Sequence, residues 1–265
     1  MARVRTTTLR KRKEDGEKIT VLTAYDYPTA KLMDEAGLDV LLVGDSVGMV
    51  VQGYPDTLGV TMDMMVYHIT MVSRAAEQAM VVGDMPFLSY QVSAEDAVRN
   101  AGRFVSEGGA HAVKLEGSAD KFGTAIRAIL DAGIPVMGHI GLTPQSINQI
   151  GGYKVQGRDP QARERLKEEA LGLEAIGCFA VVLELVQADL AGEITASLTI
   201  PTIGIGSGAG CDGQVLVMHD ILGLGMYTKF SKVFGDVKSV MEKAFRDYVR
   251  EVKEGTFPDS EHEHR

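Results

Sequence analysis

The chain has 265 residues, 45% of them hydrophobic and 24% charged, a composition that excludes disordered, collagen-like and disulfide-scaffold proteins. Its formal net charge is −9, which argues against nucleic-acid binding because that affinity depends on cationic contacts to phosphate. No apolar run approaches the roughly 20 residues of a membrane-spanning helix, and the two cysteines, Cys178 and Cys211, are too few for a disulfide framework or a zinc site. We therefore expect a cytoplasmic protein with no nucleic-acid or membrane partner.

The N-terminal segment, residues 1–13, is basic and rich in threonine. Its composition alone would allow a transit peptide, but no apolar signal core follows. Residues 8–14 instead have the pattern of a short solvated helix with a threonine cap. We interpret residues 1–16 as a helical arm, and the polar residues 256–265 as a frayed tail.

Between these ends one local pattern recurs, in which a helix-like stretch is followed by glycine and then by a short apolar run. It is clearest around Gly37, Gly109, Gly133 and Gly177. Glycine just past a helix adopts the left-handed conformation that ends it, and an unbroken apolar run is typical of a parallel strand covered on both faces. In chain order we expect strands at 19–23, 39–43, 79–82, 111–116, 135–138, 179–184, 201–205 and 214–218, and helices at 27–36, 63–78, 94–107, 119–132, 160–176, 188–197 and 232–254.

Eight strands that mostly alternate with helices imply parallel strands joined by right-handed crossovers. This length and strand count predict a single-domain (β/α)8 TIM barrel over residues 1–265, with a doubly wound open sheet as the alternative. The long, Gly- and Gln-rich segment 141–157 is expected to be a functional loop. The Gly-rich run 204–210 could cradle a phosphate or carboxylate or simply form a tight loop, and it lacks the context of a dinucleotide site.

Ionisable residues stand at the ends of five successive predicted strands. In α/β barrels the active site lies at the C-terminal ends of the strands. Alternate residues of a strand share a face, so if Ala112 faces the interior, Lys114 and Glu116 also point into the barrel mouth. The same parity from Ala180 turns Glu184 inward. The candidate site residues are Asp45, Asp84, Lys114, Glu116, His139 and Glu184.

The number of acids in this set argues for a metal. A structural ion-pair layer is the alternative, but Lys114 is one cation against four acids. Converging carboxylates with too few cations favour a hard divalent ion, and oxygen ligands suit Mg²⁺. His139 fits a hydrogen-bonded core residue as well as a substrate contact.

Seven motifs in order resemble the ketopantoate hydroxymethyltransferase family, from about Thr7 to Pro258. Two departures, Ser207 in place of an expected alanine and the extreme C-terminus, do not involve the carboxylates. The motifs are Leu22–Pro28, Val43–Met49, Gly83–Phe87, Val113–Gly117, Gly138–Gln145, Leu183–Val186 and Cys211–Asp220.

The resemblance implies transfer of a hydroxymethyl group from 5,10-methylenetetrahydrofolate to 3-methyl-2-oxobutanoate, in pantothenate biosynthesis. It also implies a homodecamer, and Mg²⁺ surrounded by Asp45, Asp84 and Glu116. Ser46 and Lys114 would hold the keto acid, with the two aspartates beside it.

The resemblance further implies that Glu184 is the base. Removal of a C3 proton from a 2-oxo acid requires a base and an electrophile on the keto oxygen, which Mg²⁺ would supply. Lys114 would add positive charge near the developing enolate.

Two other functions are compatible with an acid-rich barrel mouth. One is a Mg²⁺-dependent lyase or mutase of the isocitrate lyase and phosphoenolpyruvate mutase type, against which stands the lack of a Cys-Gly-His loop. The other is a non-catalytic barrel that binds a 2-oxo acid, against which stands the retention of all four acids and the lysine.

Overall fold

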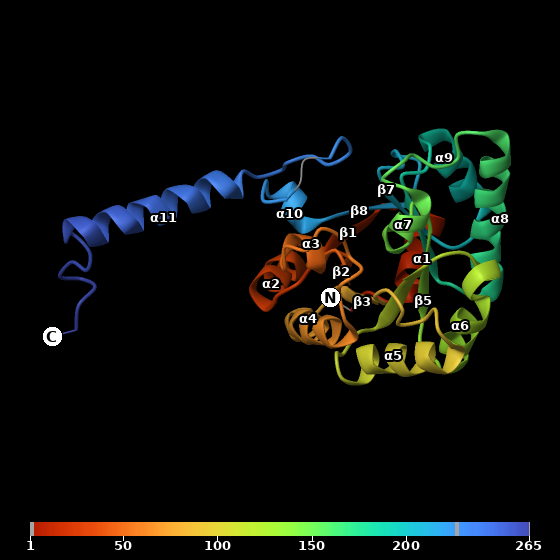
Figure 1. Ribbon diagram of the computed structural model, residues 1–265, viewed down its shortest axis with the longest axis horizontal. Coiled ribbons are helices and arrows are strands. Elements are labelled where there is room, and N and C mark those ends of the chain that lie inside the picture. Colours follow the sequence, from red (N-terminus) through yellow and green to blue (C-terminus); the bar gives the residue numbers. More distant parts are fainter. Residues whose placement is uncertain (1–2, 226–227, 265) are drawn as a thin grey trace. The chain divides into compact units, whose positions relative to one another are not determined.

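A closed barrel of eight parallel strands forms the centre of the fold (Figure 1). Each strand pairs with the next in the chain, and β8 pairs with β1 to close the ring. The predicted (β/α)8 barrel is therefore confirmed, and the open-sheet alternative is excluded. The strands are β1 (Ile19–Thr23), β2 (Val40–Val43), β3 (Met80–Asp84), β4 (Ala112–Glu116), β5 (Val136–Gly141), β6 (Ala180–Glu184), β7 (Thr202–Ile205) and β8 (Gly213–Leu216).

The computed structural model describes residues 3–225 and 228–264. It divides into two compact units, Met1–Leu216 with the barrel and Val217–Arg265. Among the described residues, no helix is long and apolar enough to span a membrane. Met1, Ala2 and Arg265, which belong to the expected arm and tail, lie outside the described residues.

The helices of the first unit surround the strands, as Figure 1 shows for α4, α5, α6 and α8. They begin where the sequence predicts: the Ser93 hydroxyl accepts a hydrogen bond from the Asp96 N–H at the start of α5, and Asp159 caps α8 in the same way. Gly177 ends α8 with φ +109°, a conformation that side chains disfavour. The helices are α2 (Tyr27–Glu35), α3 (Val47–Val50), α4 (Met62–Ala75), α5 (Ala94–Ser106), α6 (Ala119–Asp131), η1 (Pro144–Ser146), α7 (Ile147–Ile150), α8 (Pro160–Ile176) and α9 (Ala188–Ser197).

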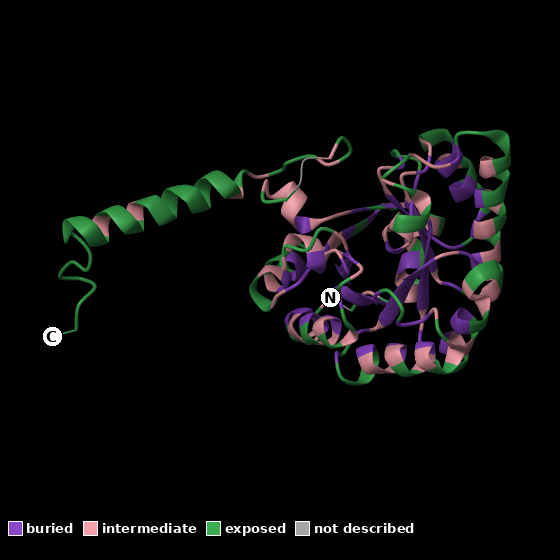
Figure 2. Ribbon diagram, viewed as in Figure 1, coloured by how far each residue is buried: buried purple, intermediate pink, exposed green. Residues whose placement is uncertain are grey.

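The barrel interior is filled with apolar side chains, and buried residues gather on the strands (Figure 2). Ala112 and Ala180 belong to this interior cluster together with Val82 and Met137. The predicted parity is thus confirmed, because residues an even number of positions beyond these also face inward.

Helix α1 (Thr6–Asp15) packs against the same interior cluster through Leu9, which is fully buried. Arg12 on this helix pairs with buried Asp39 at 2.7 Å, and Lys13 pairs with Asp212 at 2.7 Å. The expectation of a solvated helix with a threonine cap is wrong. The N-cap residue is Arg5, and the helix buries the apolar side chain of Leu9. The arm is part of the packed barrel.

The second unit contains α10 (Met218–Ile221) and α11 (Val237–Glu254). The last helix was predicted over residues 232–254, but α11 begins five residues later, at Val237. Asp236 caps it there by accepting a hydrogen bond from the Ser239 N–H. Helix α11 has no buried residue (Figure 2).

Candidate active site

All six predicted ionisable residues come together at the C-terminal mouth of the barrel. Asp84 pairs in register with Lys114, and Glu116 with His139, on neighbouring strands. Asp45 follows β2, and its backbone N–H lies 3.4 Å from the Asp84 carboxylate. These five residues are at most 4% exposed, so the charges lie in an environment that stabilises them poorly without partners.

Lys114 is the cation of this cluster. Its Nζ lies 2.7 Å from Asp84 Oδ1 and 4.0 Å from Glu116 Oε1. Burial lowers the pKa of Lys114, but the charges of Asp84, Glu116 and Asp45 outweigh burial and raise it overall. The lysine is therefore held in its charged form.

The carboxylates exceed the positive charge available to them. Burial, followed by repulsion from Asp84, raises the pKa of Asp45 to about 7. Burial also raises the pKa of Glu116 well above its usual value, against the opposing effect of Lys114. Glu116 Oε1 is buried without a hydrogen-bond partner in the described structure. The cluster therefore has too little positive charge for its carboxylates, as the sequence count of four acids against one lysine predicts.

His139 lies between two of the acids. Its Nδ1 is 3.7 Å from Glu116 Oε1 and its Nε2 is 3.3 Å from Glu184 Oε2. Burial, and then the charge of Lys114, lowers the pKa of His139 well below its usual value. A neutral imidazole therefore separates Glu184 from the cluster.

Glu184 ends β6 with its side chain 14% exposed. Burial raises the pKa of Glu184 to about 7, with Lys114 acting in the opposite direction. A carboxyl group with that pKa exchanges protons readily near neutral pH, as a general base requires.

Ser46 lies beside the cluster, at the N-cap of α3 directly after Asp45. Its Oγ is 2.8 Å from the Tyr25 hydroxyl. This position leaves Ser46 adjacent to the mouth, where the resemblance implies a substrate contact.

Gln145 joins the cluster from the loop after β5 and was not predicted as a site residue. Its Nε2 donates to Asp45 Oδ2 at 2.9 Å and to the Met85 carbonyl at 2.9 Å. Its backbone N–H donates to Glu116 Oε2 at 3.0 Å, and its Oε1 accepts from the Tyr90 hydroxyl. Gln145 thus fixes the positions of the Asp45 and Glu116 carboxylates. Its only signal in the sequence was its place at the end of the motif Gly138–Gln145.

The Gly-rich run 204–210, which begins at the end of β7, is hydrogen-bonded to the backbone of the strand that bears Glu184. The buried Ser207 hydroxyl donates to the Leu183 carbonyl at 2.7 Å and accepts from the Val186 N–H at 3.0 Å. The Ser207 side chain therefore holds the backbone on both sides of Glu184.

The carboxylates are not pre-arranged as a compact ligand set. Within residues 3–225 and 228–264, no three His, Cys, Asp or Glu side chains are grouped closely enough to hold a metal ion. Asp84 is paired with Lys114 and Asp45 with Gln145. The metal site therefore stays a prediction that rests on the charge of the cluster.

Fold and site together define a (β/α)8 barrel with a buried, acid-rich cluster at its mouth, the position at which barrel enzymes carry their active sites. Residues 3–260 match the family model described as ketopantoate hydroxymethyltransferase. The chain is 58% identical over 258 residues to the 3-methyl-2-oxobutanoate hydroxymethyltransferase of Clostridium novyi (strain NT), covering 97% of this chain and 94% of that protein. The corresponding protein of Geobacter sulfurreducens is 58% identical over 96% of both chains. The chain belongs to the ketopantoate hydroxymethyltransferase family.

Solved structures with the same fold include phosphonopyruvate hydrolase in complex with oxalate and Mg²⁺. It superposes with a TM-score of 0.65 at 14% identity, covering 98% of this chain and 93% of that one. A 2,3-dimethylmalate lyase of the PEP mutase/isocitrate lyase superfamily gives 0.62 at 18% identity, over 92% and 87%. At these identities the likeness establishes a shared barrel and nothing about the reaction.

Proposed function

We propose that this protein transfers a hydroxymethyl group from 5,10-methylenetetrahydrofolate to 3-methyl-2-oxobutanoate, giving 2-dehydropantoate for pantothenate biosynthesis. The observation that carries the proposal is the pairing of a largely buried base with a separate, acid-rich cluster that contains one cation. Glu184, with its pKa raised to about 7, lies across His139 from the cluster that contains Lys114. We further propose a cytoplasmic homodecamer, on the basis of the family resemblance.

In the proposed mechanism, different residues of the site bind the substrate, remove its proton and stabilise the charge that develops. Ser46 and Lys114 would hold the 2-oxo acid, with Asp45 and Asp84 beside it, and His139 would also contact it. Glu184 would take the proton from C3, and the positive charge of Lys114 would stabilise the enolate that forms. The enolate carbon would then bond to the one-carbon unit of the folate, water would supply the hydroxyl oxygen, and the carbon–nitrogen bonds of the methylene would break. Tetrahydrofolate would leave, its two nitrogens having taken up the C3 proton and one proton of the water.

Asp45, Asp84 and Glu116 would hold Mg²⁺, directly or through water. The donor set fits this ion because it consists of carboxylate oxygens, because Glu116 Oε1 has no hydrogen-bond partner in the described structure, and because burial and repulsion raise the pKa of Asp45. When bound, the ion supplies a Lewis acid for the oxygens of the 2-oxo acid.

The function is tested by deuterium exchange at C3 of 3-methyl-2-oxobutanoate, followed by NMR with and without methylenetetrahydrofolate. We expect exchange without the folate and 2-dehydropantoate only when both are present. A non-catalytic barrel would bind the keto acid without exchanging it. A lyase or mutase would leave the folate unused.

Removal of the metal should abolish turnover. We expect a chelator to stop both exchange and product formation, and added Mg²⁺ to restore them, because Lys114 alone does not compensate the carboxylates of the cluster. Asp84→Asn or Asp45→Asn should weaken metal-dependent keto-acid binding in calorimetry, whereas Asp63→Asn, at a side chain that is 86% exposed, should not. Full activity in metal-free enzyme would contradict the carboxylate-cluster argument.

Exchange should depend on pH with an acidic limb near 7. Because the folded-state pKa of Glu184 is raised to about 7, the base becomes protonated and inactive as the pH falls through that value. The rate should then decline roughly tenfold per pH unit well below it. Asp45 has a pKa raised to a similar value, so protonation of both carboxyl groups contributes to the limb. A rate that stays constant from pH 5 to 9 would argue against Glu184 as the base.

A further inference from the structure

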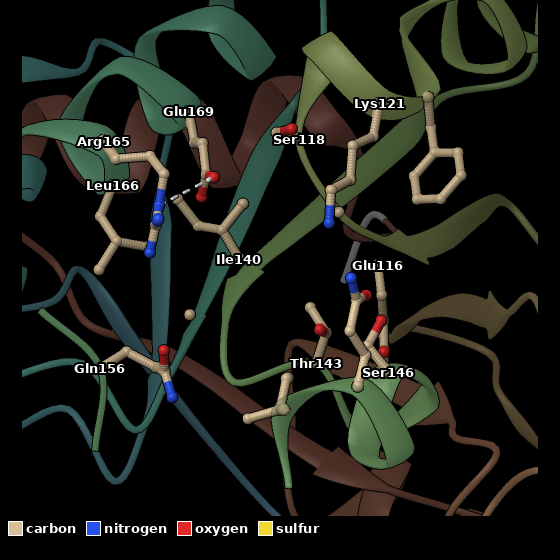
Figure 3. A pocket seen from close by; sticks show the side chains of 15 residues that line it. Glu116, Ser118, Lys121, Ile140, Thr143, Ser146, Gln156, Arg165, Leu166 and Glu169 are labelled. Atoms are coloured by element: carbon tan, nitrogen blue, oxygen red, sulfur yellow. Dashed lines mark ion pairs between the residues drawn. The ribbon is translucent and has the colours of Figure 1, made fainter. Parts of the chain in front are cut away.

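A cavity of about 650 Å³ opens beside the catalytic cluster, between α6 and α8 and next to the loop that follows β5. Figure 3 shows side chains from these three elements converging on it. Glu116 lines this cavity and also contacts Lys114 and His139. A ligand in the cavity is therefore one side chain away from the cluster at which the keto acid is proposed to react.

The cavity has apolar walls and two polar groups without hydrogen bonds. Ile140, Ile150 and Leu166 form part of its lining. Ser118 is 6% exposed, and its hydroxyl makes no capping bond to α6 or hydrogen bond to another described residue. Glu169 likewise accepts no hydrogen bond within the described part of the chain, and its only ion pair is a long one to Arg165, at 3.8 Å. The Ser118 hydroxyl and the half-buried Glu169 carboxylate are therefore free to hydrogen-bond a ligand in the cavity.

The charges of the cavity are distributed unevenly. Glu169 is the more buried member of its pair, with a side chain 22% exposed against 63% for Arg165. Burial raises the pKa of Glu169, while the charges of Arg165 and Lys121 act against this. Lys121 is also exposed and lines the cavity. A half-buried carboxylate thus lies within reach of two exposed cations.

We propose that this cavity binds the folate co-substrate, with Glu169 and Ser118 recognising the pteridine and with Lys121 and Arg165 facing the glutamyl carboxylates. The inference rests on the proposed function. A pteridine is a flat ring that apolar walls can sandwich, and its N3–H and 2-amino groups form a donor pair that suits a carboxylate. The volume falls in the range of about 300–1,000 Å³ that is typical of small-molecule sites. The shared wall at Glu116 places the methylene donor next to the keto acid.

The test compares Glu169→Gln and Ser118→Ala with the matched control Glu168→Gln. Glu168 is the next residue of α8, is exposed, and does not line the cavity. We expect Glu169→Gln to raise the KM for methylenetetrahydrofolate at least tenfold and Ser118→Ala to raise it severalfold. Both should weaken the binding of tetrahydrofolate, measured by calorimetry in the absence of keto acid. The KM for the keto acid and the folate-independent C3 exchange should stay close to wild type in both.

The exposed cations give an independent readout that does not depend on folding of the buried variants. Lys121→Gln should reduce the preference of the enzyme for a triglutamyl over a monoglutamyl folate, because it removes a charge from the opening.

The outcomes separate the two proposals. Wild-type protein that exchanges C3 but forms no 2-dehydropantoate would overturn the proposed function. Active wild-type protein, with folate KM and tetrahydrofolate affinity unchanged in Glu169→Gln and Ser118→Ala, would overturn the cavity assignment alone. An equal loss of keto-acid exchange in the variants would also overturn it, because the cavity would then act on the catalytic cluster.

Discussion

Glu184→Gln should lower C3 exchange and product formation by similar factors, on the order of 10²–10⁴. The substitution preserves the shape of the side chain and its position 3.3 Å from His139 Nε2 while removing its ability to accept a proton. Because exchange and transfer share the deprotonation step in the proposed mechanism, NMR exchange and a product assay should report the same loss.

Binding measurements separate a lost base from a damaged site. Keto-acid and Mg²⁺ binding should survive in Glu184→Gln, since the proposed ligands follow β2 or lie on β3 and β4, away from β6. Glu164→Gln, at an exposed position of α8, is the matched control and should behave as wild type. Retained exchange with lost product would move Glu184 to the folate step, and lost Mg²⁺ binding would make it a ligand.

The barrel itself could be predicted because its signals are local. Glycines past helix ends and unbroken apolar runs identify each helix–strand unit within about ten residues, and the alternation then favours parallel strands. The predicted ends of helices and strands are wrong where contacts with residues distant in the sequence determine them. Helix α4 ends at Ala75, not at the predicted residue 78, because Asp34 accepts hydrogen bonds from the N–H groups of Glu77, Gln78 and Ala79. Those bonds hold residues 77–79 as a bend before β3 and not as a continuation of the helix.

The acids of the site could be predicted for a similar reason. A charge at the end of an apolar strand is visible in the sequence, and strand parity sets its direction. Gln145 gives no such signal, since it is a neutral residue in a loop and lies 100 positions from the Asp45 carboxylate that it contacts. The side cavity was also invisible, because it forms only where α6, α8 and the loop after β5 meet. The periodicity of the sequence therefore cannot predict where a loop lies relative to distant elements.

Lys114→Met should destabilise the protein and impair catalysis together. The side chain is buried, and it is the cation within the cluster of Asp45, Asp84 and Glu116. Removal of one partner from a buried charge pair typically costs about 3–5 kcal/mol, because the remaining charge is left uncompensated. Urea denaturation of the metal-free protein should show this loss in the free energy of unfolding.

The loss of stability in Lys114→Met should grow with pH. Without the lysine, the folded-state pKa values of Asp45 and Glu116 rise further above their unfolded values near 4, because Lys114 acts to lower both. An acid with a raised folded-state pKa favours the folded state only while it is protonated. The loss of folding stability therefore begins above the unfolded-state pKa and grows with pH until the folded-state pKa is reached. The variant should therefore be closer to wild type at pH 5 than at pH 8. Lys31→Met, at an exposed ion pair with Glu77, should show little change at either pH.

The kinetics of Lys114→Met should show how the lysine acts. A higher keto-acid KM with unchanged kcat would mean that Lys114 binds the substrate equally in the ground and transition states, whereas a lower kcat would mean that it stabilises the enolate. We expect the kcat/KM for the keto acid to fall by about 10²–10³ in either case, as when one preorganised charge-stabilising group is removed. Because Nζ lies 2.7 Å from Asp84 and 4.0 Å from Glu116, unchanged stability and unchanged kinetics together would contradict the whole charge assignment of the site.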